Sequence, residues 1–316
     1  MNEIFHLNFL ENDLPDKCAN LIIADPPYFE VKGEFDFKWK TFEDYLKDVE
    51  RWAKECKRLL ADNGSLFWWG DAKKIAYSQI ILDKHFNLEN SIVWENTNPH
   101  KQQTRFSKGL RSFAPVTERC LFYSLDSLNI TSCICSIRDY IRSEIMRARG
   151  EIVFKEVNAA LGTATNGGGV ASACLSLDKL EPAMITEEMY LKLRKWLALS
   201  GDGFLSKQYE ELRQQYEELR RPFDNELNLG DVWGVPNFET SRFSHETIKP
   251  EKIAAIQINA CSRKNDLVVV PFAGSGTECA MAAKYGRRFV GYDIEGDYVN
   301  ISRDRVLQHT SQLQLF

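Results

Sequence analysis

The chain has 316 residues, enough for one α/β domain with a sizeable core or for such a domain with a large insertion. Hydrophobic residues make up 44% and charged residues 27%, as in soluble globular proteins, and no apolar run is long enough to span a bilayer. The net charge of −5 excludes a uniformly basic coat for nucleic acid but allows a local basic face. Because the first residues lack the features of a signal peptide, we expect a cytoplasmic protein with no membrane partner.

Cysteine and histidine usage bears on metal binding and redox state. The eight cysteines form no C-x-x-C pair, and the five histidines make no close pair with them. Structural zinc sites combine such ligands at short spacing, so we expect no metal. In the cytoplasm the cysteines are expected to be reduced, several of them as small core side chains.

Short apolar runs and a helical pattern give the amino-terminal third the order β-α-β-α-β. Runs of this kind suit strands that are buried on both faces. Residues 42–60 carry apolar side chains at helical spacing, and Asn63-Gly64 is interpreted as the end of that helix. The predicted strands are 4–7, 20–25, 65–70, 91–96 and 119–125.

The carboxyl-terminal part has the order α-β-α-β-α. Pro250 opens a predicted helix and Gly286 ends another. Alternating strands and helices predict an α/β fold with a mostly parallel seven-stranded sheet and helices on both faces. The helices are predicted at 250–261, 277–286 and 296–309, and the strands at 266–272 and 288–294.

The middle of the chain, residues 130–225, has helical patterns and no convincing strand. We interpret it as a helical insertion in a domain formed by residues 1–129 and 226–316. A seven-residue repeat at 208–221 is too short for a coiled coil and favours an amphipathic helix packed on its own domain. Other helices are expected at 137–150, 153–162, 170–177 and 186–199.

The segment Asp25-Pro26-Pro27-Tyr28, with Phe29 after it, follows the second predicted strand. In open α/β sheets, ligands bind at the carboxyl ends of strands. The prolines stiffen the backbone and remove N–H donors, so the local carbonyls accept without competing donors. A carboxylate beside such a carbonyl suits an –NH2 group, and the aromatic rings suit a base. A simple turn after a strand is the alternative.

A glycine-rich loop follows the strand at 266–272 and opens a helix. Its glycines permit a tight turn and the close approach of a ligand. The third glycine of a dinucleotide fingerprint is absent, which favours a small nucleoside ligand; a purely structural turn is the alternative. The loop consists of Pro271, Phe272, Ala273, Gly274, Ser275, Gly276 and Thr277.

Asp293 ends the next predicted strand, close to the spacing of about 20 residues after the glycines that nucleotide-binding acids show. An acid at this point can accept hydrogen bonds from the ribose hydroxyls of a nucleotide-like cofactor. A surface acid at a strand end is the alternative.

In their order, these motifs resemble the amino-methyltransferases that act on DNA, and in particular their β class. In that class the D-P-P-Y half comes first, a target-recognition region follows, and the glycine-rich half comes last. Here the corresponding segments are 25–28, about 96–230 and 272–276. The resemblance covers roughly residues 4–125 and 231–309. It implies a Rossmann-like methyltransferase fold and an enzyme of phage or restriction-modification type.

The resemblance implies S-adenosylmethionine as the cofactor and S-adenosylhomocysteine as the product. The loop would hold the methionine part, Asp293 the ribose, and Asp25 would also border the cofactor. Residues 244–253 are similar to the family's H-P-T-x-K-P segment, which borders the amino-acid end of the cofactor. The matching positions are His245, Thr247, Lys249 and Pro250.

The sequence departs from the family pattern at two points. Glu246 stands where the family has proline, which leaves the local loop geometry open. Asn8 stands where the family usually has an acid, so an adenine contact by that residue also stays open.

The implied reaction transfers a methyl group to an exocyclic amino group of a base in DNA. Asp25 and the Pro26 carbonyl would accept the two hydrogen bonds of the amino group, which localises the nitrogen lone pair; positioning is then the main catalytic contribution. The base must leave the duplex, so base flipping is implied, with Tyr28 and Phe29 stacking on it. The expected catalytic residues are Asp25, Pro26, Pro27 and Tyr28.

Asp rather than Ser at the start of the motif favours N6 of adenine, and N4 of cytosine is the alternative. Methylation of an amide nitrogen in RNA or protein usually accompanies N-P-P-Y instead. A non-catalytic DNA-binding regulator on a methyltransferase fold is a further alternative, against which the intact Asp25 and glycine loop argue.

Basic residues concentrate at 101–155, where ten Lys and Arg stand against five Asp and Glu, a local charge of +5. Clustered positive charge is what the binding of double-stranded DNA requires. A solvated loop is the alternative for its first part. The expected DNA contacts are Lys101, Arg105, Lys108, Arg111, Arg138 and Arg142.

The insertion also resembles the helix-turn-helix of small phage repressors, in A-A-L-G at 159–162 and in its closing helix. Its candidate reading helix carries no Arg or Asn. DNA recognition and plain helical packing therefore both stay open, as does a homodimer.

Overall fold

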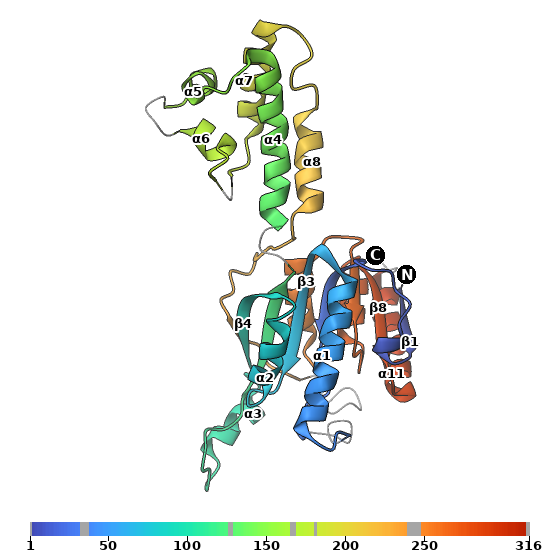
Figure 1. Cartoon of the computed structure of the whole chain (residues 1–316). Coiled ribbons are helices and arrows are strands. Elements are labelled where there is room, and N and C mark those ends of the chain that lie inside the picture. Colours follow the sequence, from blue (N-terminus) through green and yellow to red (C-terminus); the bar gives the residue numbers. More distant parts are fainter. Residues whose placement is uncertain are drawn as a thin grey trace. The chain divides into compact units, whose positions relative to one another are not determined.

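A computed structural model describes residues 2–31, 38–125, 129–164, 169–179, 182–238 and 248–313, without the side chains of 129–134 and 311–313. Contacts between residues divide the chain into two units (Figure 1). One unit contains the residues up to 126 and from 222 onward, and the other is 127–221. The sequence predicts an insertion at 130–225.

The first unit is built on an eight-stranded sheet in the order β1-β8-β7-β2-β3-β5-β4-β6. Neighbours are parallel except at β5, which is antiparallel to β3 and β4. The carboxyl ends of β2, β7 and β8 therefore meet at one edge. The strands are β1 (Asn2–His6), β2 (Ala19–Ala24), β3 (Leu60–Gly70), β4 (Asn87–Glu95), β5 (Thr117–Ser124), β6 (Val232–Gly234), β7 (Leu267–Val270) and β8 (Arg288–Asp293).

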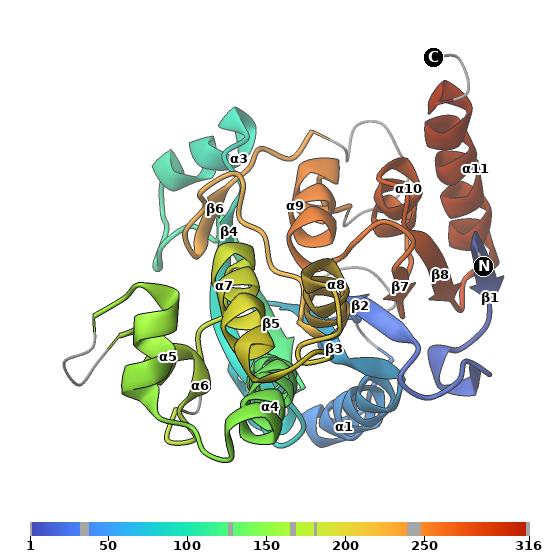
Figure 2. The ribbon, with the colours of Figure 1, turned by 90° about the horizontal axis from the view of Figure 1, so that it is seen from above.

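Helices cover both faces of this sheet (Figure 2). Because side chains alternate along a strand, Ile22 joins the core under α1 and α2, whereas Leu21 joins the core under α9, α10 and α11. Two apolar layers thus enclose the sheet, which fixes the strand ends that carry the motifs. The helices are α1 (Phe42–Leu59), α2 (Ile75–Leu82), α9 (Glu251–Cys261), α10 (Thr277–Lys284) and α11 (Gly296–Leu313).

The end of α1 differs from the prediction. Thr41 caps its start by accepting the backbone N–H of Asp44, but the helix ends at Leu59 and β3 begins at once with Leu60. Asn63-Gly64 lies inside β3. A Cβ on Gly64 would lie 2.6 Å from the Leu60 side chain and 3.0 Å from the Ala19 carbonyl oxygen, so this glycine permits close strand packing and does not end the helix.

The sheet has one strand more than the seven that the sequence predicts. The additional strand, β6, is three residues long and pairs with β4 through Val232–Gly234, too short to show an alternating pattern. The predictions also omit α2 and the short helix α3 (Pro99–Gln103). Within the described ranges, no helix combines the length and apolarity that crossing a bilayer would require.

The second unit is helical and has its own apolar core. Gly162 ends α5 in the left-handed conformation, as the sequence predicts. The repeat forms α8, whose Leu212 is buried in this core, and the hydroxyl of Tyr209 donates to the Ile185 carbonyl. The repeat therefore packs within its own unit. Its helices are α4 (Asn129–Arg149), α5 (Phe154–Leu161), α6 (Val170–Leu175), α7 (Glu187–Leu197) and α8 (Tyr209–Leu219).

Candidate active site at the carboxyl ends of the strands

A cavity of about 720 Å³ lies where β2, β7 and β8 end. The segment 25–28 follows β2, the loop 271–277 follows β7, and Asp293 ends β8. Because β5 runs antiparallel, its second residue, Glu118, reaches the same cavity. The volume falls in the range of about 300–1,000 Å³ that small-molecule sites occupy. The sequence motifs therefore converge on one site that can hold a small ligand.

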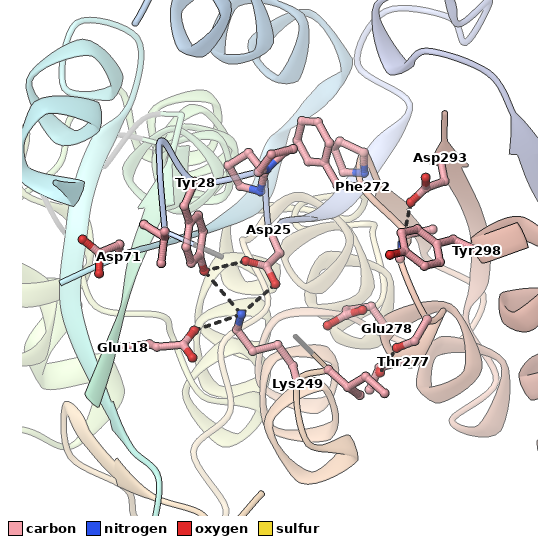
Figure 3. Close-up of a pocket in the computed structure, with 18 of the residues that line it drawn as sticks. Asp25, Tyr28, Asp71, Glu118, Lys249, Phe272, Thr277, Glu278, Asp293 and Tyr298 are labelled. Carbon is pink, nitrogen blue, oxygen red and sulfur yellow. Dashed lines mark hydrogen bonds and ion pairs between the residues drawn. The ribbon is translucent and has the colours of Figure 1, made fainter. Parts of the chain in front are cut away.

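Lys249 lies at the centre of a hydrogen-bonded group in this cavity (Figure 3). Its Nζ is 2.6 Å from Oδ2 of Asp25, 3.1 Å from Oε2 of Glu118 and 3.3 Å from the Tyr28 hydroxyl. The Tyr28 hydroxyl in turn donates to Oδ1 of Asp25 at 2.7 Å. Each oxygen of Asp25 thus accepts from a side chain that fixes its orientation, and each has a second lone pair for a further donor.

Burial and the charges of neighbouring side chains together set the charge states in this group. Burial by itself would lower the pKa of Lys249, but the attraction of Asp25 and Glu118 outweighs it and raises the pKa above the ordinary lysine value. Lys249 is therefore an ammonium group at neutral pH. Burial and the nearby Asp25 carboxylate raise the pKa of Tyr28 well above its usual value, so its phenol remains a neutral hydrogen-bond donor.

The two aromatic residues of the first motif have different surroundings. Tyr28 lines the cavity together with Pro26 and Pro27. Phe29 is 7% exposed and packs in the core, with its ring centroid 5.3 Å from that of Phe42. It is absent from the cavity wall, so the structure does not support the prediction that Phe29 stacks on a base. Its packing instead fixes the turn that carries Tyr28.

The glycine-rich loop lines the cavity with all its residues except one. Gly276 is the exception; its φ is +73°, and a Cβ there would lie 2.7 Å from Cα of Ser302 in α11. Of the two predicted reasons for this glycine, the tight turn is present, whereas the structure does not support the close approach of a ligand. Gly276 permits the turn and the packing of the loop on α11. The wall is formed by Pro271, Phe272, Ala273, Gly274, Ser275 and Thr277.

Asp293 is held by the backbone around it. Its Oδ2 accepts the N–H of Gly274 at 2.8 Å, and its Oδ1 accepts the N–H of Glu295 at 2.9 Å. Burial raises the pKa of Asp293 despite these donors. The carboxyl group joins the end of β8 to the glycine-rich loop, at the position expected for a ribose contact.

Arg305 of α11 supports the loop from inside the protein. Its side chain is fully buried, and its guanidinium lies 2.7 Å from the Thr277 hydroxyl and 3.0 Å from the Glu251 carboxylate. Sequence reasoning passes over this residue because it stands in an ordinary amphipathic helix, 28 residues from the hydroxyl that it contacts.

Glu278 is a second residue that the motifs do not reveal. It stands in the first turn of α10, is 7% exposed, and lines the cavity with its side chain directed toward Asp25 and Lys249 (Figure 3). Burial, with a smaller contribution from Asp25, raises its pKa to about 7. An acid in the first turn of a helix is common, so only the fold shows that this one faces the cavity.

The structure describes only some of the remaining residues that are predicted to bind the cofactor. Lys249 precedes α9, whereas His245 and Thr247 lie outside the described residues. Asn8 lines the cavity and caps a short helix by accepting the N–H of Leu10. Over the parts of the chain that the structure describes, no group of three or more His, Cys, Asp or Glu side chains could hold a metal ion.

The basic segment between β4 and β5 forms an exposed arm, residues 99–113, which extends away from the sheet at α3 (Figure 1). Lys101 both lines the cavity and belongs to this arm. Arg105 pairs with Glu95 at 2.6 Å, while Lys108 and Arg111 have no ion pair among the described side chains. The predicted phosphate contacts of the arm are therefore accessible and begin at the edge of the cavity.

Two arginines of the insertion have internal partners. Arg138 is 9% exposed, pairs with Asp139 at 2.9 Å and donates to the carbonyl of Ser176. Arg142 donates to the carbonyl of Leu175 at 2.6 Å. The guanidinium groups hold α4 to the last residue of α6 and to the residue that follows it. The burial of Arg138 does not support the prediction that it contacts DNA, because a phosphate contact would require it to leave these partners.

Comparison with known proteins shows the family of this chain. A model of the DNA methylase family that includes N6 and N4 methyltransferases matches residues 19–304. The type II methyltransferase M2.LlaDCHI of Lactococcus lactis is 35% identical, over 94% of this chain and 85% of that protein. M.HinfI of Haemophilus influenzae is 22% identical, and the match spans 64% of its length.

A solved structure shows the same fold. The PvuII DNA methyltransferase, described as cytosine-N4-specific, matches with a TM-score of 0.55 and 12% identity, over 98% of this chain and 91% of that one. This likeness shows that the two proteins share a fold. The chain belongs to the N6/N4 DNA methylase family, as its two motifs predict.

Proposed function

We propose that this protein transfers the methyl group of S-adenosylmethionine to N6 of adenine in double-stranded DNA. The observation that carries the proposal is the Asp25 carboxylate, held by Lys249 and Tyr28 on the wall of the cavity that the glycine-rich loop and Asp293 also line. An acceptor for an amino group and a loop suited to a nucleoside therefore share one site.

The residues present fit the cofactor. Asp293 is fixed at the end of β8, where it can accept from ribose hydroxyls. Glu278 and Lys249 offer opposite charges near the loop, which suit the ammonium and carboxylate groups of a methionine. When bound, S-adenosylmethionine supplies an electrophilic methyl group on its sulfonium.

The target base would enter beside Asp25. The Asp25 carboxylate and the Pro26 carbonyl would each accept one hydrogen bond from the exocyclic amino group, which draws the nitrogen lone pair out of the ring. Tyr28, a neutral donor to Asp25, presents its ring to the base. Lys249 keeps the carboxylate in one orientation, so little reorganisation accompanies the reaction. The enzyme would thus act chiefly by positioning the nitrogen.

Adenine is proposed over cytosine because the motif begins with Asp25 and not with serine. A carboxylate accepts strongly from an amino group of either base, so the cavity itself is compatible with both. Cytosine N4 therefore remains the second candidate, in line with the fold shared with a cytosine-N4-specific enzyme.

The arm is proposed to hold the DNA backbone. Lys108 and Arg111 are exposed, and no acidic residue lies between Lys101 and Phe113. Since Lys101 also lines the cavity, phosphates held by the arm would lie next to the site that receives the base.

The proposal is tested by incubating the protein with DNA and methyl-labelled S-adenosylmethionine, digesting the DNA and separating the nucleosides. Label in N6-methyladenine is the expected result. Label in N4-methylcytosine would keep the mechanism and overturn the choice of base. Transfer to RNA or protein, with none to DNA, would overturn the proposed substrate.

A further inference from the structure

Glu278 differs from the two motif acids, Asp25 and Asp293, in that no other residue bonds to its carboxylate. Asp25 accepts from Lys249 and Tyr28, and Asp293 accepts from two backbone N–H groups. Among the described residues, no other residue forms a hydrogen bond or ion pair with the Glu278 side chain, which is 7% exposed; only its own backbone N–H bonds to it. A carboxylate that is buried without a cation to pair with is costly, so this position favours a positively charged ligand.

The cations nearest to Glu278 already have partners. Lys249 bonds to Asp25 and Glu118, and Arg305 bonds to Thr277 and Glu251. Both affect the pKa of Glu278 through space, but neither forms an ion pair with it. A ligand that pairs with Glu278 must therefore carry its own positive charge and at least one N–H donor.

We propose that Glu278 binds the α-ammonium group of the methionine part of S-adenosylmethionine. This inference rests on the cofactor named in the proposed function. Asp293 would bind the ribose and so fix one end of the cofactor. The methyl group must reach a base at Asp25. The amino-acid part therefore lies between the glycine-rich loop and Lys249, where Glu278 faces the cavity (Figure 3).

The ammonium group is the part of the cofactor that this site selects. A sulfonium carries positive charge but no N–H or O–H and cannot donate to a carboxylate. The ammonium group donates three hydrogen bonds, and a charge-assisted bond to a buried carboxylate is among the strong polar interactions of proteins. The carboxylate of the cofactor would lie instead toward Lys249, away from Glu278.

The test compares two ligands and two proteins by calorimetry. The ligands are S-adenosylhomocysteine and its analogue that lacks only the α-amino group; the proteins are the wild type and Glu278→Gln. We expect Glu278→Gln to weaken S-adenosylhomocysteine binding about 10- to 100-fold. The affinity of Glu278→Gln for the deaminated analogue should equal that of the wild type. Glutamine preserves size, and the melting temperature checks the fold.

The pH dependence of ligand affinity gives a second readout, which is measured first on the wild type. The charged groups nearest to Glu278 are Asp25 after β2, Lys249 before α9 and Arg305 of α11. Because the ammonium needs an ionised partner, wild-type affinity for S-adenosylhomocysteine should rise between about pH 6 and pH 8, and affinity for the deaminated analogue should not. In Glu278→Gln the rise should be absent.

The outcomes separate the two claims. An equal loss for both ligands in Glu278→Gln, or no loss for either, would overturn the role of Glu278, and so would a pH series that is flat for both ligands. If the wild type fails to bind S-adenosylhomocysteine at all, the cofactor of the proposed function is wrong and this inference fails with it.

Discussion

The cavity and the arm use the same kinds of charged residue in opposite ways. Lys249 is 5% exposed and bonds to three side chains, so its position is fixed. Lys108 and Arg111 in the arm are exposed and make no ion pair with any described residue. Phe106 and Phe113 of the same arm are also exposed.

The difference matches two tasks. Chemistry on an amino group requires acceptors that are already oriented, which only burial and mutual hydrogen bonds provide. Holding a DNA backbone requires accessible positive charge that adapts to many sequences. The cavity should therefore be sensitive to single substitutions and the arm only to the removal of several charges together.

The largest effect is expected at Asp25. Asp25→Ala removes the acceptor of the amino group, so methyl transfer should fall by about 10²- to 10³-fold or more. S-adenosylhomocysteine should still bind, because the loop and Asp293 remain. Single-turnover transfer and calorimetry measure the two properties, with exposed Asp62→Ala as the control. Near-normal turnover in Asp25→Ala would contradict the mechanism.

Glu278 makes the stability of the cofactor-free protein depend on pH. Its pKa in the folded protein is about 7, against an ordinary value of 4.5, so the folded state favours the protonated form. The stability that this provides is complete below about pH 4.5 and is lost as the pH rises through 7. Glu278→Gln should therefore be more stable than the wild type at pH 8, by on the order of 3 kcal/mol.

Denaturant unfolding of both proteins at pH 5 and pH 8 measures this difference. The difference in unfolding free energy between the two proteins should become smaller toward pH 5. At pH 8, saturating S-adenosylhomocysteine should reduce this difference, because the ligand then pairs with Glu278 in the wild type. Equal stabilities of the two proteins at both pH values would mean that Glu278 is not buried as described.

Gly276 tests whether the loop is held by packing. Gly276→Ala places a Cβ 2.7 Å from Cα of Ser302 at a φ of +73°, and should lower the unfolding free energy by about 1–3 kcal/mol. Gly286→Ala is a matched control, since it has the same φ of +73° but no atom within 4 Å of the added Cβ. A smaller loss for Gly276→Ala than for Gly286→Ala would contradict the packing role.

The smallest effect per residue is expected in the arm. Replacing Arg105, Lys108 and Arg111 by Ala should weaken binding to all DNA sequences and reduce the slope of log affinity against log salt by up to about three units. Arg105 should contribute least because it already pairs with Glu95. Affinity for S-adenosylhomocysteine should not change.

The control for the arm removes equal charge from the opposite edge of the sheet, at Lys264, Lys284 and Arg288, which are exposed near the amino ends of β7 and β8. An equal loss of DNA binding in the control would mean that net charge, and not the arm, holds the DNA. A loss confined to one DNA sequence would mean that the arm reads base edges.

The sequence predicts the parts of this molecule that depend on residues close to one another in the chain. Asp25 to Tyr28 and the loop 271–277 each combine a strand end with special backbone chemistry in a few residues, so they are visible without a fold. The seven longer strands have clear apolar runs, whereas β6 has three residues and forms only because β4 offers an edge.

The rest depends on long-range packing. Glu118 reaches the cavity because β5 is antiparallel, and Glu278 faces it because α10 starts at the loop. Arg138 looks like a surface cation in the sequence but is buried in the insertion, and Gly276 is required by a residue of α11. No local pattern shows which side chain a distant element will contact.

The most direct test of the central claim is a crystal structure of the protein with S-adenosylhomocysteine and a methylatable duplex. We predict a flipped adenine in the cavity, with N6 about 2.6–3.2 Å from the Asp25 carboxylate and from the Pro26 carbonyl oxygen. Lys249 and Tyr28 should keep their bonds to Asp25. A flipped base whose amino group lies away from Asp25, with Asp25 bonded to the cofactor instead, would contradict the account.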